Sequence, residues 1–395
     1  MTELSLRRST KSVFHEQEPQ YVSADGRERT WVTRGGNFAV GYSEVEAGAV
    51  LEREDDREEF MVILPPDGAT ATFEAGGARI EAGNDSLTIV PPGKSRITVT
   101  SGGVMARIFS RAAADVMALA ANGAAYADGA PELAAPDPWP APYDGFRLRH
   151  YPLGRYADPD GPRIQPRAFR STNMLVNIFV HYRTRRGTTG LSPHWHDDFE
   201  QASLCLNGRW VHHMRYNWGA DSALWWPDDH GEMATPSVII IPARAIHTSQ
   251  DVGPDGPESS LYDIFCPPRL DFAAKKGFCI NEDEYPLPAG AEASCGAVRT
   301  ELERWLDAAS LDALSRFADE DHGFLELARV WPLDGRERRA MWRHAVAPGR
   351  WELADRYPRW AASAAWWPAM YAAHAAFSVR RLGQRLAQRR RRSLD

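Results

Sequence analysis

Cysteine is scarce in this chain of 395 residues: there are four, and no two of them form a Cys-x-x-Cys pair. This pattern indicates neither a thiolate zinc knuckle nor a disulfide framework. The first twenty residues also lack the apolar stretch of a secretory signal, so we expect a cytoplasmic protein. The net charge of −7 provides no basic surplus, and we expect no nucleic-acid partner.

The chain also has little that could cross a membrane. Its most apolar segment, residues 360–379, is rich in alanine and contains Pro368 and His374. A membrane span usually needs about 20 strongly apolar residues. We therefore expect a core or interfacial helix. Because the segment leads into an arginine-rich tail, peripheral contact with an anionic membrane or with another protein is the alternative.

Short alternating or apolar runs, bounded by Gly, Pro, Asn and Asp, predict a mainly β protein. We expect one β unit over residues 1–127, a Pro-rich linker over 128–166 and a second β unit over 167–289. From residue 290 to residue 395 apolar positions recur every three or four residues. That spacing predicts an α-helical C-terminal region, which ends in the basic tail.

The second β unit repeats the first. Three pairs of segments match in the same order: 29–42 with 167–182, 86–99 with 237–250, and 106–115 with 262–271. Ordered matches of this kind predict an internal duplication. An insertion around residues 217–236 lengthens the second copy and is expected to form a loop or hairpin.

Histidine is absent between residues 16 and 149, but the second unit contains "SPHWHDDFEQ" at residues 192–201. In an extended strand residues of equal parity face one side, so His194, His196 and Glu200 are predicted to point together. His247 follows a Pro-bounded turn in "IPARAIHTS". Three imidazoles and a carboxylate form a good ligand set for one divalent transition metal: Fe(II), Mn, Ni, Co, Cu or Zn.

These two stretches resemble the motifs of a known family. "GLSPHWHDDFEQASLCLNG" resembles the first motif of the cupin superfamily, and "PARAIHTS" resembles the second. The spacing from Glu200 to Gly208 is one residue longer than usual, and Ala243 or Arg244 replaces a glycine of the turn. Over about residues 29–275 the resemblance implies a bicupin, with two jelly-roll β-barrels in tandem and the metal in the second barrel only.

The first copy carries no histidine at the matching positions. Counting along the aligned segments places Glu52, Glu54 and Glu58 where the second copy has His194, His196 and Glu200, and it places Arg96 where the second copy has His247. We expect these charged side chains to form salt bridges. A structural role is expected for this barrel, either covering the other one or forming a homodimer interface.

Two further residues, His213 and Gln201, are weaker candidates for a contact with a metal ligand or with substrate. The simpler interpretation of His213 is a solvated or cross-strand histidine. For the four ligand candidates, the alternative to metal binding is that they are unrelated polar side chains. Most of the tryptophans in this region are expected to pack in the core, and the alternative is that they line a ligand pocket.

The cupin resemblance implies a metal-dependent enzyme that acts on a small oxygenated organic molecule. With Fe(II), the favoured metal, the expected activity is that of a dioxygenase. With Zn, Mn or Ni, Lewis-acid chemistry would suit an isomerase or a lyase. A non-catalytic ligand-binding bicupin is the third interpretation, because a shared fold does not determine a function.

Overall fold

The structure of the protein is a computed structural model, which describes residues 7–156, 167–179, 185–189, 191–196, 199–218, 222–256 and 258–288. All of them belong to one compact unit, Met1–Ala291. The predicted helical C-terminal region and its basic tail lie outside the described residues. Within the described part of the chain, no helix is both long enough and apolar enough to cross a membrane.

The first barrel is built from two antiparallel sheets. Its strands are β2 (Tyr21–Val22), β3 (Glu28–Arg34), β4 (Phe38–Val45), β5 (Val50–Asp56), β6 (Phe60–Leu64), β7 (Thr70–Ala75), β8 (Ala78–Ala82), β9 (Ser86–Val90), β10 (Gly93–Ser101), β11 (Gly103–Ser110) and β12 (Arg149–Pro152). The larger sheet has the order β12-β9-β6-β11-β4-β3-β2, and the smaller has the order β5-β10-β7-β8. Short helices accompany this barrel: η1 (Phe14–Glu16), α1 (Ala114–Leu119), η2 (Gly123–Tyr126) and η3 (Leu153–Tyr156).

The second barrel also has a larger and a smaller sheet. Its strands are β1 (Thr10–Val13), β13 (Ala168–Arg170), β14 (Leu175–Ile178), β15 (Gln201–Asn207), β16 (Trp210–Arg215), β17 (Glu232–Met233), β18 (Ser237–Ile241), β19 (Ile246–Asp251) and β20 (Ser260–Phe265). The larger sheet has the order β1-β18-β15-β20-β14-β13, and the smaller has the order β17-β16-β19. The helices here are η4 (Ser222–Leu224) and α2 (Leu270–Ala273).

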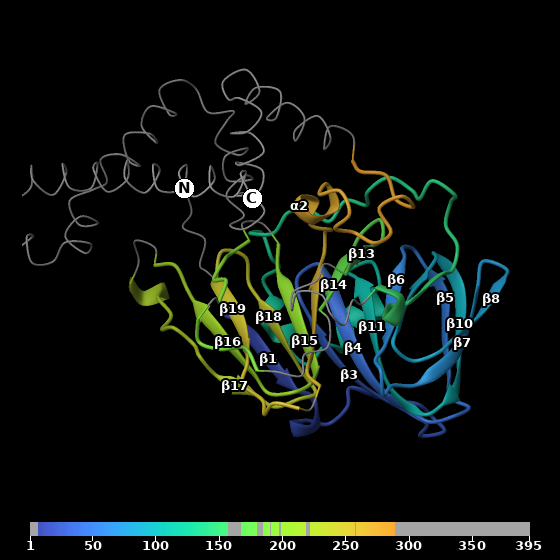
Figure 1. The fold of residues 1–395 in the computed structure, drawn as a ribbon, viewed down its shortest axis with the longest axis horizontal. Helices are drawn as coiled ribbons and strands as arrows, with labels where there is room; N and C mark the ends of the chain where they lie inside the picture. The colour runs from blue at the N-terminus through green and yellow to red at the C-terminus, as the bar shows by residue number, and fades with distance from the viewer. Residues whose placement is uncertain are drawn as a thin grey trace, which may run out of the picture. The chain divides into compact units, whose positions relative to one another are not determined.

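The two larger sheets correspond strand by strand, with β9, β6, β11, β4 and β3 in the places of β18, β15, β20, β14 and β13. Each sheet ends on a strand from elsewhere in the chain. β1, close to the N-terminus, pairs with β18 of the second barrel, where Figure 1 shows it among the later strands. β12, from the predicted linker, pairs with β9 of the first barrel. The mainly β fold is thus confirmed, whereas the origin of the two copies by duplication stays a prediction.

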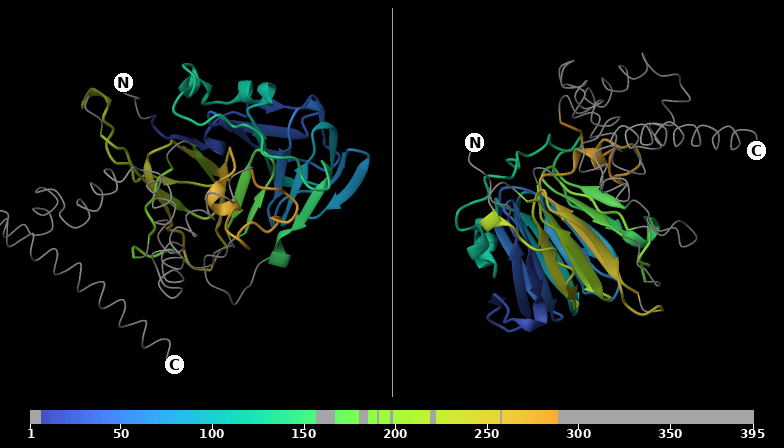
Figure 2. Two further views of the ribbon diagram at one scale, coloured as in Figure 1. Left: turned by 90° about the horizontal axis from the view of Figure 1, so that it is seen from above. Right: turned by 90° about the vertical axis from the view of Figure 1, so that its left-hand side faces the viewer.

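The two larger sheets pack face to face, as the right-hand view of Figure 2 shows. One cluster of buried side chains joins them, and it includes Met61 and Ile63 of β6 and Ala202 and Leu204 of β15. Each sheet is therefore covered on both faces, by the other sheet and by its own barrel interior. This explains why β6, β9 and β18 are buried at every residue, and why β6 reads as a continuous apolar run.

The interiors of the two barrels differ in chemistry. The inward residues of β6 are Phe60, Val62 and Leu64, which belong to an extensive apolar core inside the first barrel. At the corresponding places β15 has Gln201, Ser203 and Cys205, all of them buried. Side chains alternate along a strand. Ala202 and Leu204 therefore contribute to the apolar layer between the two larger sheets, whereas Gln201, Ser203 and Cys205 point into the second barrel. The second barrel thus has polar side chains in its interior, beside apolar ones such as Ile239 and Ile241, and these polar positions are where chemistry can be placed.

A buried glutamate connects the first barrel to the second. Glu59, immediately before β6, accepts hydrogen bonds from the backbone N and the Oγ1 of Thr172, both at 3.0 Å. The hydroxyl of Tyr285 donates to its other oxygen at 2.8 Å. Burial raises the pKa of Glu59, and these hydrogen bonds act against that rise.

We expect Glu59→Ala to lower the free energy of unfolding by about 3 kcal/mol, because it leaves buried donors on Thr172 and Tyr285 without an acceptor. Chemical denaturation followed by circular dichroism measures the loss. The control is Glu54→Ala, which removes an exposed ion pair with Lys94 and should cost less than about 0.5 kcal/mol. Equal losses in the two variants would contradict the role given to Glu59.

Candidate metal centre

The backbone brings two of the predicted histidines together. The amide N of His194 donates to the carbonyl of His247 at 3.1 Å, and the amide N of His247 donates to the carbonyl of His194 at 2.8 Å. Residues that exchange both hydrogen bonds lie directly opposite each other, so their side chains start close together. The amide N of Arg244 donates to the carbonyl of His196 at 2.5 Å, which ties the third histidine to the same turn.

Arg244 occupies the turn position at which the cupin motif carries a glycine. Its φ of 67° lies in the left-handed region, which glycine adopts more readily than other residues. The turn nevertheless places β19 so that His247 is its second residue and faces the barrel interior. An arginine at this position is therefore compatible with an inward-facing His247.

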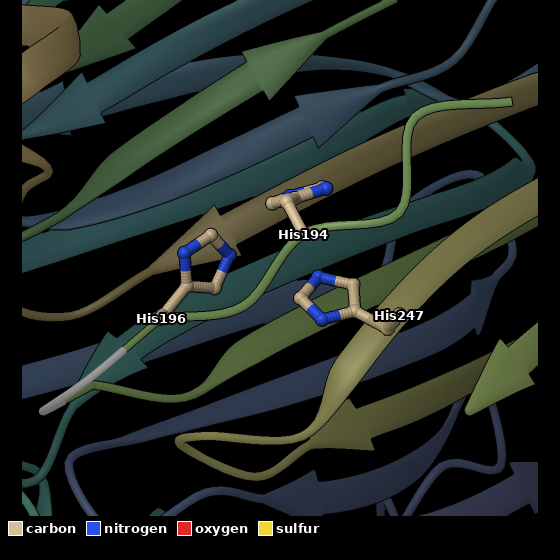
Figure 3. Close-up of side chains that lie close together, drawn as sticks. All are labelled: His194, His196 and His247. Atoms are coloured by element: carbon tan, nitrogen blue, oxygen red, sulfur yellow. The ribbon is translucent and has the colours of Figure 1, made fainter. Parts of the chain in front are cut away.

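The three imidazole rings surround a common space, as Figure 3 shows. The ring centroids of His194 and His196 are 5.1 Å apart, those of His194 and His247 4.5 Å, and those of His196 and His247 5.0 Å. One nitrogen of each ring lies within 4.8 Å of a nitrogen of the other two. His196 and His247 are buried, and His194 is partly buried. Such spacing suits three imidazoles that bind one metal ion.

Backbone carbonyls orient two of the rings. The Nδ1 of His194 lies 2.8 Å from the carbonyl oxygen of Ser192, and the Nδ1 of His247 lies 2.9 Å from the carbonyl oxygen of Ala245. A carbonyl can only accept, so each Nδ1 carries the proton and each Nε2 keeps its lone pair. Metal-binding histidines are commonly held in this way, with the second nitrogen bonded to a carbonyl or carboxylate.

The electrostatics of the site keep two of the imidazoles neutral. Burial, followed by the charges of Arg269 and the neighbouring histidines, holds the pKa of His196 well below its ordinary value. Burial and His194 do the same to the pKa of His247. Because both pKa values are low, these two side chains are in the neutral form at physiological pH. The neutral imidazole is the form that binds metals.

Gln201, the first residue of β15, completes the group. Its Oε1 lies 3.0 Å from the Nε2 of His196 and 3.3 Å from the Nε2 of His247. Because His247 uses its single proton at Nδ1, its Nε2 lone pair and the Gln201 oxygen are two acceptors that face each other. A cation between such atoms would turn this repulsion into attraction. The residues present therefore fit a metal ion.

The structure places Glu200, the fourth predicted ligand, outside this group. Its Oε2 accepts a hydrogen bond from the backbone N of Gly36 at 2.6 Å, and its Oε1 accepts one from the hydroxyl of Tyr126 at 2.8 Å. The parity count does not apply, because residues 199–200 do not belong to a strand and β15 begins only at Gln201. Gln201, not Glu200, is on the inward side.

Glu200 has a counterpart in the first barrel. Glu59 stands one residue before β6, as Glu200 stands one residue before β15. Glu200 accepts a backbone N–H from the β3–β4 loop and a hydroxyl from Tyr126, which follows β11. Glu59 likewise accepts a backbone N–H from the β13–β14 loop and a hydroxyl from Tyr285, which follows β20. The two glutamates form a matched pair of joints between the barrels. The residue of the first barrel that corresponds to Glu200 is therefore Glu59, and not Glu58 as the count along the sequence had placed it.

The other predicted residues are found away from the three histidines. Arg96 pairs with Glu52 at 2.6 Å, which confirms the expected salt bridge, and Glu54 pairs with Lys94. Glu58 accepts hydrogen bonds from Ser110 and Asn173. His213 contacts His230 at 2.9 Å and Gln250 at 3.0 Å, on the less buried face of β16.

The tryptophans of this region differ from the expectation of core packing. Trp210 is buried, but Trp195, Trp218, Trp225 and Trp226 are exposed. Trp218 and Trp225 stack on each other, with ring centroids 4.4 Å apart. Both lie in the insertion around residues 217–236.

Asp263 was not identified from the sequence, although it belongs to the site. It lies on β20 directly opposite Ser203, and the hydroxyl of Ser203 donates to its Oδ1 at 2.7 Å. Burial raises its pKa to about 6, against the hydrogen bonds from Ser203 and Gln201 and the charge of Arg269. One pattern in the sequence could have pointed to Asp263. Gln201, Ser203 and Asp263 are polar residues that alternate with apolar residues along β15 and β20, at the inward positions.

Comparisons with known proteins find no matching family model and no matching curated protein. Solved structures that resemble the chain include a cupin barrel protein and oxalate decarboxylases. A cupin 2 conserved barrel domain protein from Leptotrichia buccalis has 7% identity, covers 67% of this chain and 99% of its own, and has a TM-score of 0.40. The oxalate decarboxylase of Lactobacillus farciminis, in a formate complex, has 15% identity, coverages of 70% and 92%, and a TM-score of 0.44. A mutant of Bacillus subtilis oxalate decarboxylase has 14% identity, coverages of 77% and 85%, and a TM-score of 0.43.

We expect Glu200→Ala to lower the free energy of unfolding by about 2 kcal/mol, because it removes the acceptor for the Gly36 amide and the Tyr126 hydroxyl. Metal affinity should stay within about twofold of wild type, since no ligand atom is lost. Isothermal titration with Zn²⁺ and chemical denaturation measure the two quantities. Glu59→Ala, at the matching position, is the control, and a loss of metal binding in Glu200→Ala alone would show that Glu200 is a ligand.

Proposed function

We propose that the second barrel is the active unit of a metal-dependent enzyme of the cupin type. His194, His196 and His247 would hold one divalent transition metal, with Gln201 beside them. The observation that supports this best is the convergence of three imidazoles, two of them oriented by backbone carbonyls, on one space inside the second barrel. The first barrel, whose interior is apolar, would support the second without chemistry of its own.

A divalent metal held by imidazoles keeps open positions for substrate oxygens and supplies Lewis-acid polarisation or, as Fe(II), the reduction of dioxygen. The residues of the chain prepare the site for it. The carbonyls of Ser192 and Ala245 keep two Nε2 atoms unprotonated. The enclosed setting of His196 and His247 limits access of water and strengthens every charge interaction in the site.

The lead function is a dioxygenase that acts on a small oxygenated organic molecule. A nitrogen-rich donor set without thiolate is compatible with Fe(II), as it is with Zn, Cu or Ni, and Fe(II) is the metal that would give this reaction class. A second candidate is an isomerase, lyase or decarboxylase that uses the metal as a Lewis acid.

The direct test is the metal content of purified protein after anaerobic loading with iron, manganese, zinc or nickel. Wild type should carry one transition metal ion per chain, whereas His194→Ala and His247→Ala should lose it. A loss of one of three imidazoles should weaken binding by more than about 100-fold, since each provides a direct bond to the metal. His213→Ala, on the less buried face of β16, is the matched control and should retain the metal.

Dioxygen uptake by the iron-loaded protein with a set of small keto acids, hydroxy acids and diketones would then distinguish the two candidates. Uptake that depends on His247 supports the dioxygenase. Substrate conversion without uptake supports the Lewis-acid alternative. Wild-type protein without stoichiometric metal under all four loading conditions would contradict the proposal as a whole.

A further inference from the structure

A chain of buried hydrogen bonds runs from Gln201 away from the histidines. The Nε2 of Gln201 donates to the Oγ of Ser203 at 2.9 Å, and this Oγ donates to the Oδ1 of Asp263 at 2.7 Å. Gln201 and Ser203 are two residues apart on β15 and so face the same side. Asp263 stands directly opposite Ser203 on the neighbouring strand. Both residues on β15 are almost fully buried.

The direction of these hydrogen bonds follows from the number of protons. A carboxylate only accepts, so the single proton of the Ser203 hydroxyl goes to Asp263. Toward Gln201 the hydroxyl can then only accept, so the amide nitrogen of Gln201 has to face Ser203. The amide oxygen is thereby turned toward His196 and His247. Without Asp263, either end of the amide could face the histidines.

We propose that Asp263, acting through Ser203, is a positioning residue that holds the Gln201 oxygen toward the metal, and that the resulting neutral donor set selects anionic oxygen ligands. This inference rests on the metal centre proposed above. It adds a role for two residues that do not touch the metal position. It also assigns the chemical class of the molecule that binds there, a carboxylate or an enolate.

The preference for an anion follows from charge. Three imidazoles and an amide oxygen carry no charge, so a divalent ion bound to them would keep its full charge of two. A glutamate in the place of Gln201 would cancel half of that charge. Arg269, which is buried over the rings of Phe265 and Phe272, adds a further positive charge, and Phe265 in turn contacts the ring of His196. Asp263, the carboxylate of this network, is separated from Gln201 by the two hydrogen bonds through Ser203.

The test uses full-length protein loaded with Co(II), whose visible absorption reports the ligands around the metal. The Co(II) dissociation constant is measured by competition with a chelator. Acetate and its neutral isostere acetamide are then titrated into the loaded protein, and both are followed in the visible spectrum. The variants are Ser203→Ala, Asp263→Asn and Gln201→Glu, with circular dichroism as the check on folding.

Ser203→Thr and Ser237→Ala are the controls. Ser203→Thr keeps the hydroxyl and should restore binding. Ser237→Ala removes another buried serine hydroxyl, on the neighbouring strand β18, for which the described residues offer no hydrogen-bond partner. It should leave the spectrum and both affinities unchanged.

Ser203→Ala and Asp263→Asn should each weaken Co(II) binding about tenfold, as loss of a residue that orients a ligand typically does. Both should also change the visible spectrum while the fold is retained. Gln201→Glu should bind Co(II) at least as tightly as wild type, but it should bind acetate about tenfold more weakly because of the added charge. Its affinity for acetamide should not change.

Two results would overturn the inference while leaving the proposed function intact. One is Co(II) binding and spectra within twofold of wild type in both Ser203→Ala and Asp263→Asn. The other is an unchanged ratio of acetate to acetamide affinity in Gln201→Glu. A wild-type protein that binds no Co(II) would instead overturn the proposed metal centre, and the inference with it.

Discussion

The face-to-face packing of the two larger sheets is the constraint on which the rest of the structure depends. Because each of these sheets is covered on both sides, every inner strand must give one set of alternate residues to the layer between the barrels. Ala202 and Leu204 belong to that layer, so only the residues between them can enter the barrel interior. The position of any polar residue on β15 is therefore decided by parity relative to this apolar layer.

The same constraint explains why two barrels of similar topology have different roles. In the first barrel the inward positions of β6 are apolar and fill a conventional core. In the second barrel the inward positions of β15 and β20 include Gln201, Ser203 and Asp263, which need hydrogen-bond partners and provide them for one another. A barrel with polar side chains in its interior loses part of its own hydrophobic stabilisation. The shared layer, and the joints at Glu59 and Glu200, provide a fixed frame that can carry such a barrel.

Those two joints also show how a motif can be misread. Glu200 lies in a stretch that resembles the first cupin motif, and its residue type suits a metal ligand. In the structure its carboxylate holds the loop between β3 and β4, where a Cβ at Gly35 would lie only 2.8 Å from the Glu200 oxygen. The close approach accounts for the glycine there. The matching contacts of Glu59 with Thr172 and Tyr285 show that this arrangement belongs to the two-barrel architecture and not to the chemistry of one barrel.

Much of the fold could be predicted from the sequence, since short apolar runs between turn residues are a local signal. The three histidines could also be predicted, because two share one short stretch and the third follows a recognisable turn. The place of Glu200 could not be predicted, because the parity count assumed a continuous strand from His194 to Glu200. Asp263 was missed since its role depends on pairing between β15 and β20, which are about 60 residues apart and whose register no local pattern reveals. The predicted helical C-terminal region stays a prediction.

The central claim is that three imidazoles of the second barrel bind one metal ion. X-ray absorption spectroscopy at the metal edge of the loaded protein tests this most directly, because imidazole rings produce a characteristic multiple-scattering pattern. We predict a spectrum that fits three imidazoles, with nitrogen at about 2.0–2.1 Å if zinc is the metal, and oxygen atoms in the remaining positions. A spectrum with one imidazole or none, or with sulfur in the first coordination sphere, would contradict the account.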